Sequence, residues 1–249
     1  MTSPSAYSPP DQLLRDRIIL VTGAGAGIGK VAATTFASYG ATVVLLGRTQ
    51  DKLEATYDEI EAAGHPQPGL VVVDMETASM AEYSALAEQL GETFGRLDGL
   101  LHNASLLGER KPIESASASE WQKVMQVNVN AQMMLTQAML PLLKEAPHAS
   151  VVFTSSGVGR QGRAYWGAYA VSKFATEGFM QVLADELENT CEVRVNSLNP
   201  GATRTSMRAA AYPAEDPNSL KTPEQIMPAY LYLMGDDSLE VNGQALSAQ

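Results

Sequence analysis

A glycine-rich turn directly after the first apolar segment constrains the fold of this chain more than any other feature. Residues 17–21 form an apolar β run, and residues 22–29 read Thr-Gly-Ala-Gly-Ala-Gly-Ile-Gly. A helix is predicted from about residue 29 to residue 39, because Gly40 is a typical helix stop. Glycines in such a turn let the backbone approach a pyrophosphate, which binds at the helix N-terminus. The turn therefore predicts a dinucleotide site, and a purely structural glycine turn is the alternative.

Apolar runs and helical segments alternate along the rest of the chain. Six further strands are predicted at residues 41–46, 70–73, 97–101, 150–153, 193–198 and 244–246. Helices are predicted at 51–63, 80–94, from Ser119 as N-cap to about 143, 169–187, and from a capping box at 222–225 to about 234. Continuous apolar strands that alternate with helices indicate a parallel sheet covered on both faces. We therefore predict an α/β fold with a single doubly wound Rossmann-type domain, about seven parallel strands and helices on both faces.

Three segments differ in their predicted organisation. Residues 1–12 are rich in Ser and Pro and are interpreted as a loose N-terminal arm without the apolar core of a signal peptide. Residues 13–249 form the single domain. Within it, residues 201–220 follow no steady period, and their length and composition are typical of a mobile substrate lid.

Composition excludes several classes of function. The net charge of −11 argues against nucleic-acid binding as the main role. No apolar run is long enough to span a membrane, so we expect a cytoplasmic protein. The single cysteine and three histidines have no metal-ligand spacing, and we expect no metal site.

The glycine turn matches one of the three nucleotide-binding patterns that we tested. The Walker pattern fails because Ala24 and Val31 stand where it needs Gly and Ser or Thr. The pattern G-x-G-x-x-G also fails from either possible start. The pattern T-G-x-x-x-G-x-G fits, with its fixed positions at Thr22, Gly23, Gly27 and Gly29.

The end of the second predicted strand indicates which coenzyme is preferred. An acidic residue there would bind the adenosine ribose hydroxyls and favour NAD. This chain has Gly47 and Arg48 instead, and arginine is suited to pair with a 2′-phosphate. We therefore favour NADP(H), with NAD(H) as the alternative; Arg48 could otherwise be an ordinary surface arginine.

Tyr169 and Lys173 are four residues apart, so on a helix they share one face. An ammonium beside a phenol favours the phenolate and lowers the pKa of the phenol. Such a pair is suited to pass a proton to or from a substrate oxygen. An ordinary amphipathic helix is the alternative.

Taken together, these motifs and several others resemble those of the short-chain dehydrogenase/reductase family over nearly the whole length of the sequence. The motifs that carry this resemblance are the glycine turn, Asp74, His102–Ser105, Asn128, Ser155–Ser156, Tyr169 with Lys173, Asn199–Gly201 and Thr205. Within the family, it is most similar to the bacterial YciK-like oxidoreductases, through residues 159–163, 173–178 and 233–237.

The resemblance implies a role for each matched residue. Tyr169 would be the general acid or base, and Lys173 would lower its pKa and bind the nicotinamide ribose. Ser156, thirteen residues before the tyrosine, would hydrogen-bond the substrate oxygen. Asn128 would hold a helix irregularity and a water that links Lys173 to solvent. The implied coenzyme contacts are Gly23, Gly25, Gly27, Ile28, Gly29, Arg48, Asp74, Asn103, Tyr169, Lys173, Pro200, Gly201, Thr203 and Thr205.

The sequence departs from the family pattern at two places in the coenzyme site. Many NADP-preferring members have a basic residue where this chain has Ala26, which leaves the choice of phosphate largely to Arg48. Many members also have glycine where this chain has Ser105.

The resulting hypothesis is an NADP(H)-dependent oxidoreductase that interconverts a carbonyl and an alcohol. A coenzyme-binding regulatory protein without significant turnover is the alternative. The expected partners are a small-molecule substrate and further copies of the chain, in a homodimer or homotetramer. The apolar residues that suggest this pairing are Met133, Met134, Met139, Phe174, Phe179 and Met180.

The sequence does not identify the substrate, but arginines cluster in the segments that should flank it. They are Arg160, Arg163, Arg204 and Arg208. Arginine suits carboxylates and phosphates, so an anionic carbonyl compound is predicted. The alternative is that these arginines pair with acids such as Glu215 and Asp216, or contact the coenzyme phosphates.

Overall fold

A parallel sheet of seven strands forms the centre of the structure, a computed structural model that describes residues 4–249. The strands are β1 (Ile18–Thr22), β2 (Thr42–Gly47), β3 (Gly69–Val72), β4 (Gly99–His102), β5 (Ala149–Thr154), β6 (Val193–Asn199) and β7 (Ala245–Ser247). Their order is β3-β2-β1-β4-β5-β6-β7, and every pair is parallel. The order reverses between β1 and β4, which is the topology of a doubly wound sheet. The predicted fold class and strand number are confirmed.

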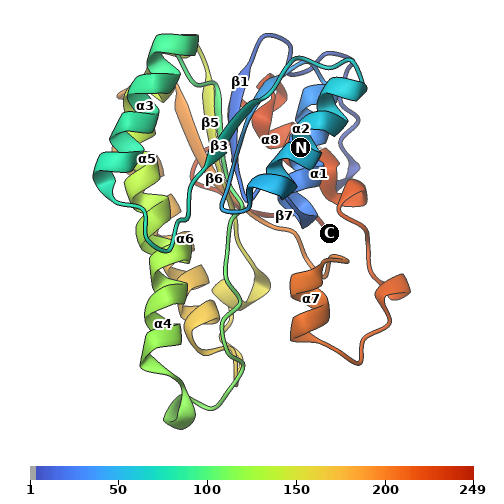
Figure 1. Cartoon of the computed structure of the whole chain (residues 1–249), viewed down its shortest axis with the longest axis vertical. Coiled ribbons are helices and arrows are strands. Elements are labelled where there is room, and N and C mark those ends of the chain that lie inside the picture. The colour runs from blue at the N-terminus through green and yellow to red at the C-terminus, as the bar shows by residue number, and fades with distance from the viewer. Residues whose placement is uncertain (1–3) are drawn as a thin grey trace.

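Helices cover both faces of the sheet (Figure 1). One face carries α1 (Gly27–Ser38), α2 (Gln50–Ala62) and α8 (Met227–Met234). The other carries α3 (Met80–Phe94), α5 (Ala131–Lys144) and α6 (Gly167–Leu187). The helices α4 (Ala118–Met125) and α7 (Ser206–Ala211) project beyond the same end of the sheet (Figure 1).

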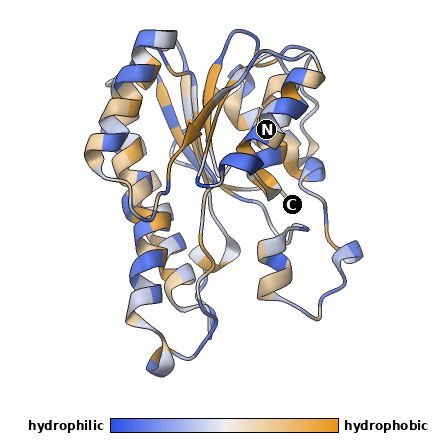
Figure 2. Cartoon of the chain, in the orientation of Figure 1, coloured by the Kyte–Doolittle hydropathy of each residue, from blue (hydrophilic) through white to orange (hydrophobic). Residues whose placement is uncertain are grey.

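Each face of the sheet has its own apolar core because successive strand residues point to opposite faces. In β1, Leu20 belongs to the core under α3, α5 and α6. Its neighbours Ile19 and Val21 belong to the core under α1, α2 and α8. All three are fully buried, which explains why the strand reads as a continuous apolar run. Figure 2 shows the same arrangement, with the strands mostly hydrophobic and hydrophilic residues along the outer helices.

The helix predicted from Ser119 to about residue 143 is divided into three parts. A five-residue π-helical segment, Gln126–Asn130, separates α4 from α5. The predicted N-cap was wrong, because Ser117 caps α4 by accepting a hydrogen bond from the Glu120 backbone N–H at 3.4 Å. Ser119 lies inside the first turn. A π segment inside a helix is frequently found at functional sites.

The segment after β6 contains a helix that the sequence pattern did not predict. This helix, α7, begins after Thr205, whose hydroxyl accepts a hydrogen bond from the Arg208 backbone N–H at 3.1 Å. With six residues, it is too short to show a helical period. Near the C-terminus, the predicted helix starts as a 3₁₀ turn, Glu224–Ile226, and becomes α-helical at Met227.

The N-terminal segment packs against the domain from Pro4 onward, and residues 1–3 of the predicted arm lie outside the described residues. The Tyr7 ring meets the Tyr232 ring edge-on at 5.3 Å between centroids. The Tyr7 hydroxyl also donates a hydrogen bond to Asp237 at 2.5 Å. These contacts hold the described part of the segment on α8. Within residues 4–249, no helix is long and apolar enough to cross a membrane.

Candidate active site

Two adjoining pockets lie where the parallel strands end, one of about 290 Å³ and one of about 320 Å³. We call the first pocket A and the second pocket B. Pocket A lies over the ends of β1, β4, β5 and β6, and pocket B over the ends of β1, β2 and β3. Five residues line both pockets: Gly23, Ala26, Ala104, Ser105 and Ser206. The two pockets therefore form one continuous groove at the position that the doubly wound topology predicts.

Most of the predicted site residues line this groove. Pocket A is lined by Gly23, Gly27, Ile28, Asn103, Ser156, Tyr169, Lys173, Pro200, Gly201, Thr203 and Thr205. Pocket B is lined by Gly23, Gly25, Arg48 and Asp74. Asn128 and Gly29 line neither pocket and are buried behind them. Segments that are far apart in the sequence therefore meet at one edge of the sheet.

The N-terminus of α1 faces pocket A without a side-chain cap. Ala26 precedes the helix and provides no capping hydrogen bond, while Gly27 and Ile28 line the pocket. The N–H groups of a first helical turn have no partner within the helix, so they are available to an anion. Gly23 adopts a positive φ of 70°. A Cβ on Gly29 would lie 2.3 Å from the Gly23 carbonyl oxygen, so a glycine is required there for packing.

Ser105 contributes an unpartnered hydroxyl to the junction of the two pockets. Its Oγ is buried and has no hydrogen-bond partner within residues 4–249. A buried hydroxyl without a partner costs free energy unless a ligand or water satisfies it. A dinucleotide would supply partners for both groups: a ribose hydroxyl for Ser105, and a pyrophosphate for the free N–H groups of α1.

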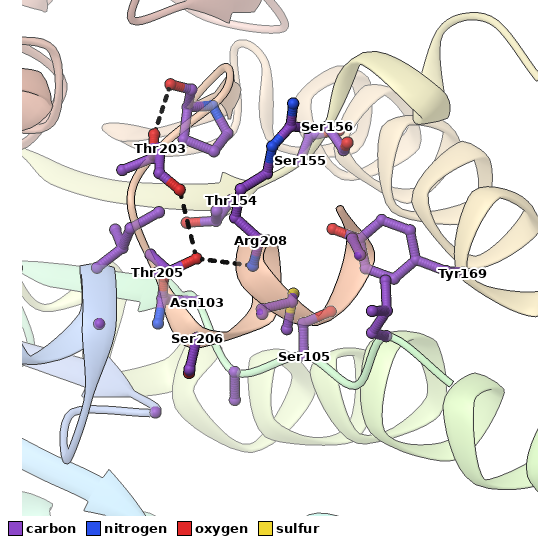
Figure 3. A pocket seen from close by; sticks show the side chains of 18 of the residues that line it. Asn103, Ser105, Thr154, Ser155, Ser156, Tyr169, Thr203, Thr205, Ser206 and Arg208 are labelled. Carbon is purple, nitrogen blue, oxygen red and sulfur yellow. Dashed lines mark hydrogen bonds between the residues drawn. The ribbon is translucent and has the colours of Figure 1, made fainter. Parts of the chain in front are cut away.

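Tyr169 and Lys173 lie on α6 with their side chains buried beside pocket A. Figure 3 shows the Tyr169 hydroxyl turned toward the centre of the pocket. The Lys173 Nζ donates a hydrogen bond to the Thr154 carbonyl oxygen at 2.8 Å and lies 5.6 Å from the centre of the Tyr169 ring. Thr154 is the last residue of β5, so the sheet fixes the position of the ammonium.

Burial changes the pKa of both groups. It raises the pKa of Tyr169 to about 12, although a hydrogen bond with Ser156 works in the opposite direction. It lowers the pKa of Lys173 to about 8, although the Glu177 carboxylate favours the ammonium. The pKa of Tyr169 is therefore raised overall rather than lowered, because desolvation of the phenolate dominates; a lowering contribution from Lys173 stays a prediction. Tyr169 therefore carries its proton at neutral pH.

The two neighbouring serines have different surroundings. The Ser155 hydroxyl donates a hydrogen bond to the buried carboxylate of Glu177 at 2.6 Å. The Ser156 hydroxyl works to lower the pKa of Tyr169, and it accepts a long hydrogen bond of 3.4 Å from the Val158 backbone N–H. Ser156 is therefore the serine of this pair that can share a substrate oxygen with Tyr169.

Asn128 connects the loop after β4 to α6. It is fully buried in the π-helical segment, and its Oδ1 accepts a hydrogen bond from the Leu106 backbone N–H at 2.8 Å. Its Nδ2 donates to the Leu106 carbonyl oxygen at 2.9 Å and to the Ser172 hydroxyl at 3.0 Å. The Ser172 hydroxyl in turn donates to the Tyr169 carbonyl oxygen at 2.8 Å. The water expected between Asn128 and Lys173 stays a prediction.

Pocket B contains a second cation that the sequence analysis did not identify. Lys52, four residues after Arg48, lines pocket B together with it. Both side chains are exposed, and neither forms a salt bridge within residues 4–249. The Asp74 carboxylate accepts a hydrogen bond from the Glu76 backbone N–H at 3.0 Å. Lys52 could have been found from its position in the first turn of the helix that follows Arg48.

Three of the four arginines expected to bind an anionic substrate are engaged within the protein. Arg208 forms a bidentate pair with Glu215, with both N–O distances 2.6 Å. The Arg160 Nε donates to Glu177 at 3.2 Å, and the Arg204 Nε donates to the Pro217 carbonyl oxygen at 2.7 Å. Arg163 is exposed and lines neither pocket. Pairing with acids, the alternative, is observed for Arg208 and Arg160.

The fold and the site together match one protein family. A family model described as short chain dehydrogenase matches residues 17–216, and the chain belongs to this family of oxidoreductases. It is 56% identical over 243 residues to the uncharacterized oxidoreductase YciK of Escherichia coli (strain K12), which covers 98% of this chain and 96% of that protein. The predicted resemblance is confirmed.

Two solved structures of short chain dehydrogenases are similar to the chain over its whole fold. One, from Shigella flexneri 2a str. 301 and complexed with NADP, is 55% identical with a TM-score of 0.94. The other, from Escherichia coli CFT073 and complexed with NADPH, is 56% identical with a TM-score of 0.94. Each match covers 96% of this chain and 100% of the other chain.

Replacement of Asn128 by Ala should destabilise the protein by about 2–4 kcal/mol, because it leaves buried polar groups of Leu106 and Ser172 without a partner. Asn130→Ala is the matched control: it lies in the same π segment but is exposed, and its side chain bonds only Gln126. Its cost should stay within about 0.5 kcal/mol. Urea denaturation measures both values, and equal costs would contradict the role assigned to Asn128.

Proposed function

We propose that the protein is an NADP(H)-dependent oxidoreductase that interconverts a carbonyl and an alcohol. The observation that carries this proposal is the meeting of Ser156, Tyr169 and Lys173 in pocket A, next to the uncapped N-terminus of α1. A proton donor, a second hydroxyl and an ammonium converge there, beside the groove that pockets A and B form. A regulatory protein that only binds a coenzyme would not need this set.

In the proposed mechanism, Tyr169 donates its proton to the substrate oxygen as negative charge develops there. The Ser156 hydroxyl hydrogen-bonds the same oxygen and stabilises that charge. The Lys173 ammonium, fixed on the Thr154 carbonyl, stabilises the phenolate that remains. The coenzyme supplies the hydride chemistry when bound. Because burial raises the pKa of Tyr169 to about 12, the phenol is protonated at neutral pH and holds the proton that carbonyl reduction needs.

The chain's own residues would hold the coenzyme at three places. The first turn of α1 would bind the pyrophosphate, and Ser105 would offer its hydroxyl to a ribose. Arg48 and Lys52 would pair with the 2′-phosphate of NADP, which is the coenzyme named for two similar structures. Residues 201–220, with α7, would act as the lid over the nicotinamide end.

Tyr169→Phe should lower the rate of carbonyl reduction about 10²- to 10⁴-fold, because the proton donor is lost. Its affinity for NADPH should stay close to that of the wild type, since the ring remains. Tyr165→Phe is the control, because Tyr165 is 58% exposed and should be dispensable. The measurement is NADPH oxidation with a panel of aldehydes and ketones, together with a coenzyme titration. Retention of more than about a tenth of the wild-type rate would remove Tyr169 from this role.

Arg48→Ala and Lys52→Ala should each weaken NADPH about tenfold and leave NADH nearly unchanged, because only NADPH carries the 2′-phosphate. Both cations are exposed, so the loss should be smaller at high salt. Dissociation constants for the two coenzymes, measured by fluorescence titration, test this. Equal loss for NADPH and NADH would show that the pair does not select the phosphate.

We propose further that the protein is a homodimer or homotetramer that pairs through α5 and α6. Met134, Met139, Phe179 and Met180 do not support this, since they lie in or against the protein's own core. The residues that do support it are exposed by 42–56%: Met133, Val171, Phe174 and Val182. The three on α6 follow a spacing close to the helical period and share one face. An exposed apolar face of this kind favours self-association.

Light scattering at micromolar concentration should therefore report a multiple of the 26.6 kDa chain mass. Phe174→Glu should reduce this mass toward that of a single chain, because a charge would be buried without a partner. Ile113→Glu is the control, since Ile113 is 67% exposed outside α5 and α6 and should leave the mass unchanged. A wild type that remains monomeric would reject the proposal.

A further inference from the structure

Arg110 lies over two aromatic rings, and one of them, Trp166, lines pocket A. Its guanidinium carbon is 4.6 Å from the centre of the Trp166 ring and 4.9 Å from the centre of the Tyr212 ring. The two rings contact each other at 5.8 Å. Trp166 lines pocket A, so Arg110 stands beside one of the pocket's own walls. The rings hold the guanidinium by cation–π contacts, and Arg110 as a residue is exposed.

Arg110 has no acidic partner, although the chain carries 28 acids and only 17 Lys plus Arg. Within residues 4–249, its side chain forms neither a salt bridge nor a hydrogen bond. Its nearest acidic neighbour in sequence, Glu109, pairs with Lys111 at 2.7 Å. Glu215, on the segment that carries Tyr212, is held by Arg208. In an acidic protein, an immobilised arginine whose N–H groups are free is a ready site for an external anion.

The wall of pocket A near Tyr169 and Trp166 is formed by apolar side chains. Leu107, Trp166, Met207 and Ala211 line pocket A, and all four belong to or pack on one small apolar cluster around Tyr169. The centres of the Tyr169 and Trp166 rings are 5.7 Å apart. The guanidinium carbon of Arg110 is 4.6 Å from the centre of the Trp166 ring. A molecule of one aromatic ring or a short chain has the length to reach from Tyr169 to Arg110.

We propose that Arg110 binds the carboxylate of a substrate whose carbonyl group is reduced at Tyr169. The substrate class is a carbonyl acid with an apolar body, its carboxylate on the side opposite the reacting carbon. This inference rests on the proposed function and deepens it. Arg110 is thus proposed for the anion-binding role that the sequence suggested for other arginines. Three of those, Arg160, Arg204 and Arg208, are already bonded within the protein.

The test compares 4-formylbenzoate with its methyl ester, which differ in the charge at the far end of the ring. The wild type should reduce the acid with the higher kcat/KM, and this preference should decrease as salt increases. Arg110→Met keeps an apolar chain on the rings but removes the charge. It should lower kcat/KM for the acid about tenfold and leave the ester nearly unchanged. Arg110→Lys should restore part of the preference for the acid.

Binding is measured separately, by quenching of tryptophan fluorescence with NADP⁺ present, so that the readout does not depend on turnover. Arg110→Met should weaken 4-formylbenzoate about tenfold and the ester by much less. Arg163→Met is the matched control: it removes the same charge from an exposed arginine of the segment before α6. It should change neither the acid-to-ester ratio nor the affinity.

Three results would overturn the inference. Equal losses for acid and ester in Arg110→Met would mean that Arg110 only supports the pocket wall. An equal effect of Arg163→Met would mean a general effect of surface charge. Wild-type protein that binds no 4-formylbenzoate would exclude a carboxylate site. If binding depends on Arg110 but neither compound is reduced, the proposed function fails and the anion site stands. If only the ester is reduced, the proposed function stands and the anion site fails.

Discussion

The burial of an ammonium group organises the candidate active site. Lys173 has 1% of its surface exposed, and its charge is accommodated by the Thr154 carbonyl at the end of β5 and by the nearby Glu177 carboxylate. Glu177 is itself bonded by Ser155 and Ser197, at the ends of two neighbouring strands. A buried charge without such partners would cost several kcal/mol. The register of β5 and β6 against α6 is therefore fixed by the same bonds that place Lys173 beside Tyr169.

A second constraint comes from the backbone. The N-terminus of α1 lacks a side-chain cap, the π-helical segment interrupts α4 and α5, and Ser105 keeps a buried hydroxyl without a partner. Each of these departs from the arrangement that would be most stable in isolation, and all three lie at or directly behind the groove. Local rules of stability are commonly broken at functional sites. Their concentration around pockets A and B is independent support for the proposed location of the chemistry.

The sequence predicted the sheet well because each strand is buried on both faces and therefore reads as an unbroken apolar run. It predicted the residues of the groove from short motifs, since those motifs follow strands whose ends meet at one edge. It failed where the signal is tertiary. A six-residue helix has no visible period. Lys52 matters because the first turn of α2, which carries it, brings it to pocket B with Arg48. Arg110 depends on rings more than 50 residues away in sequence. The pKa of Tyr169 also could not be predicted, because it depends on how deeply the phenol is buried, and the spacing of Tyr169 and Lys173 gives no information on burial.

The strand order has a consequence for synthesis of the chain on the ribosome. Strand β1 lies inside the sheet, between β2 and β4, yet β4 begins only at residue 99, with Ile19 paired to Gly99. The groove is lined by residues from Gly23 to Ala211, so its walls do not come together until more than four fifths of the chain has emerged. Until then, the apolar faces of β1 and β2 are only partly covered. Such late, long-range pairing is slow and leaves edges open to aggregation, so expression at low temperature or with abundant chaperones should favour the native protein.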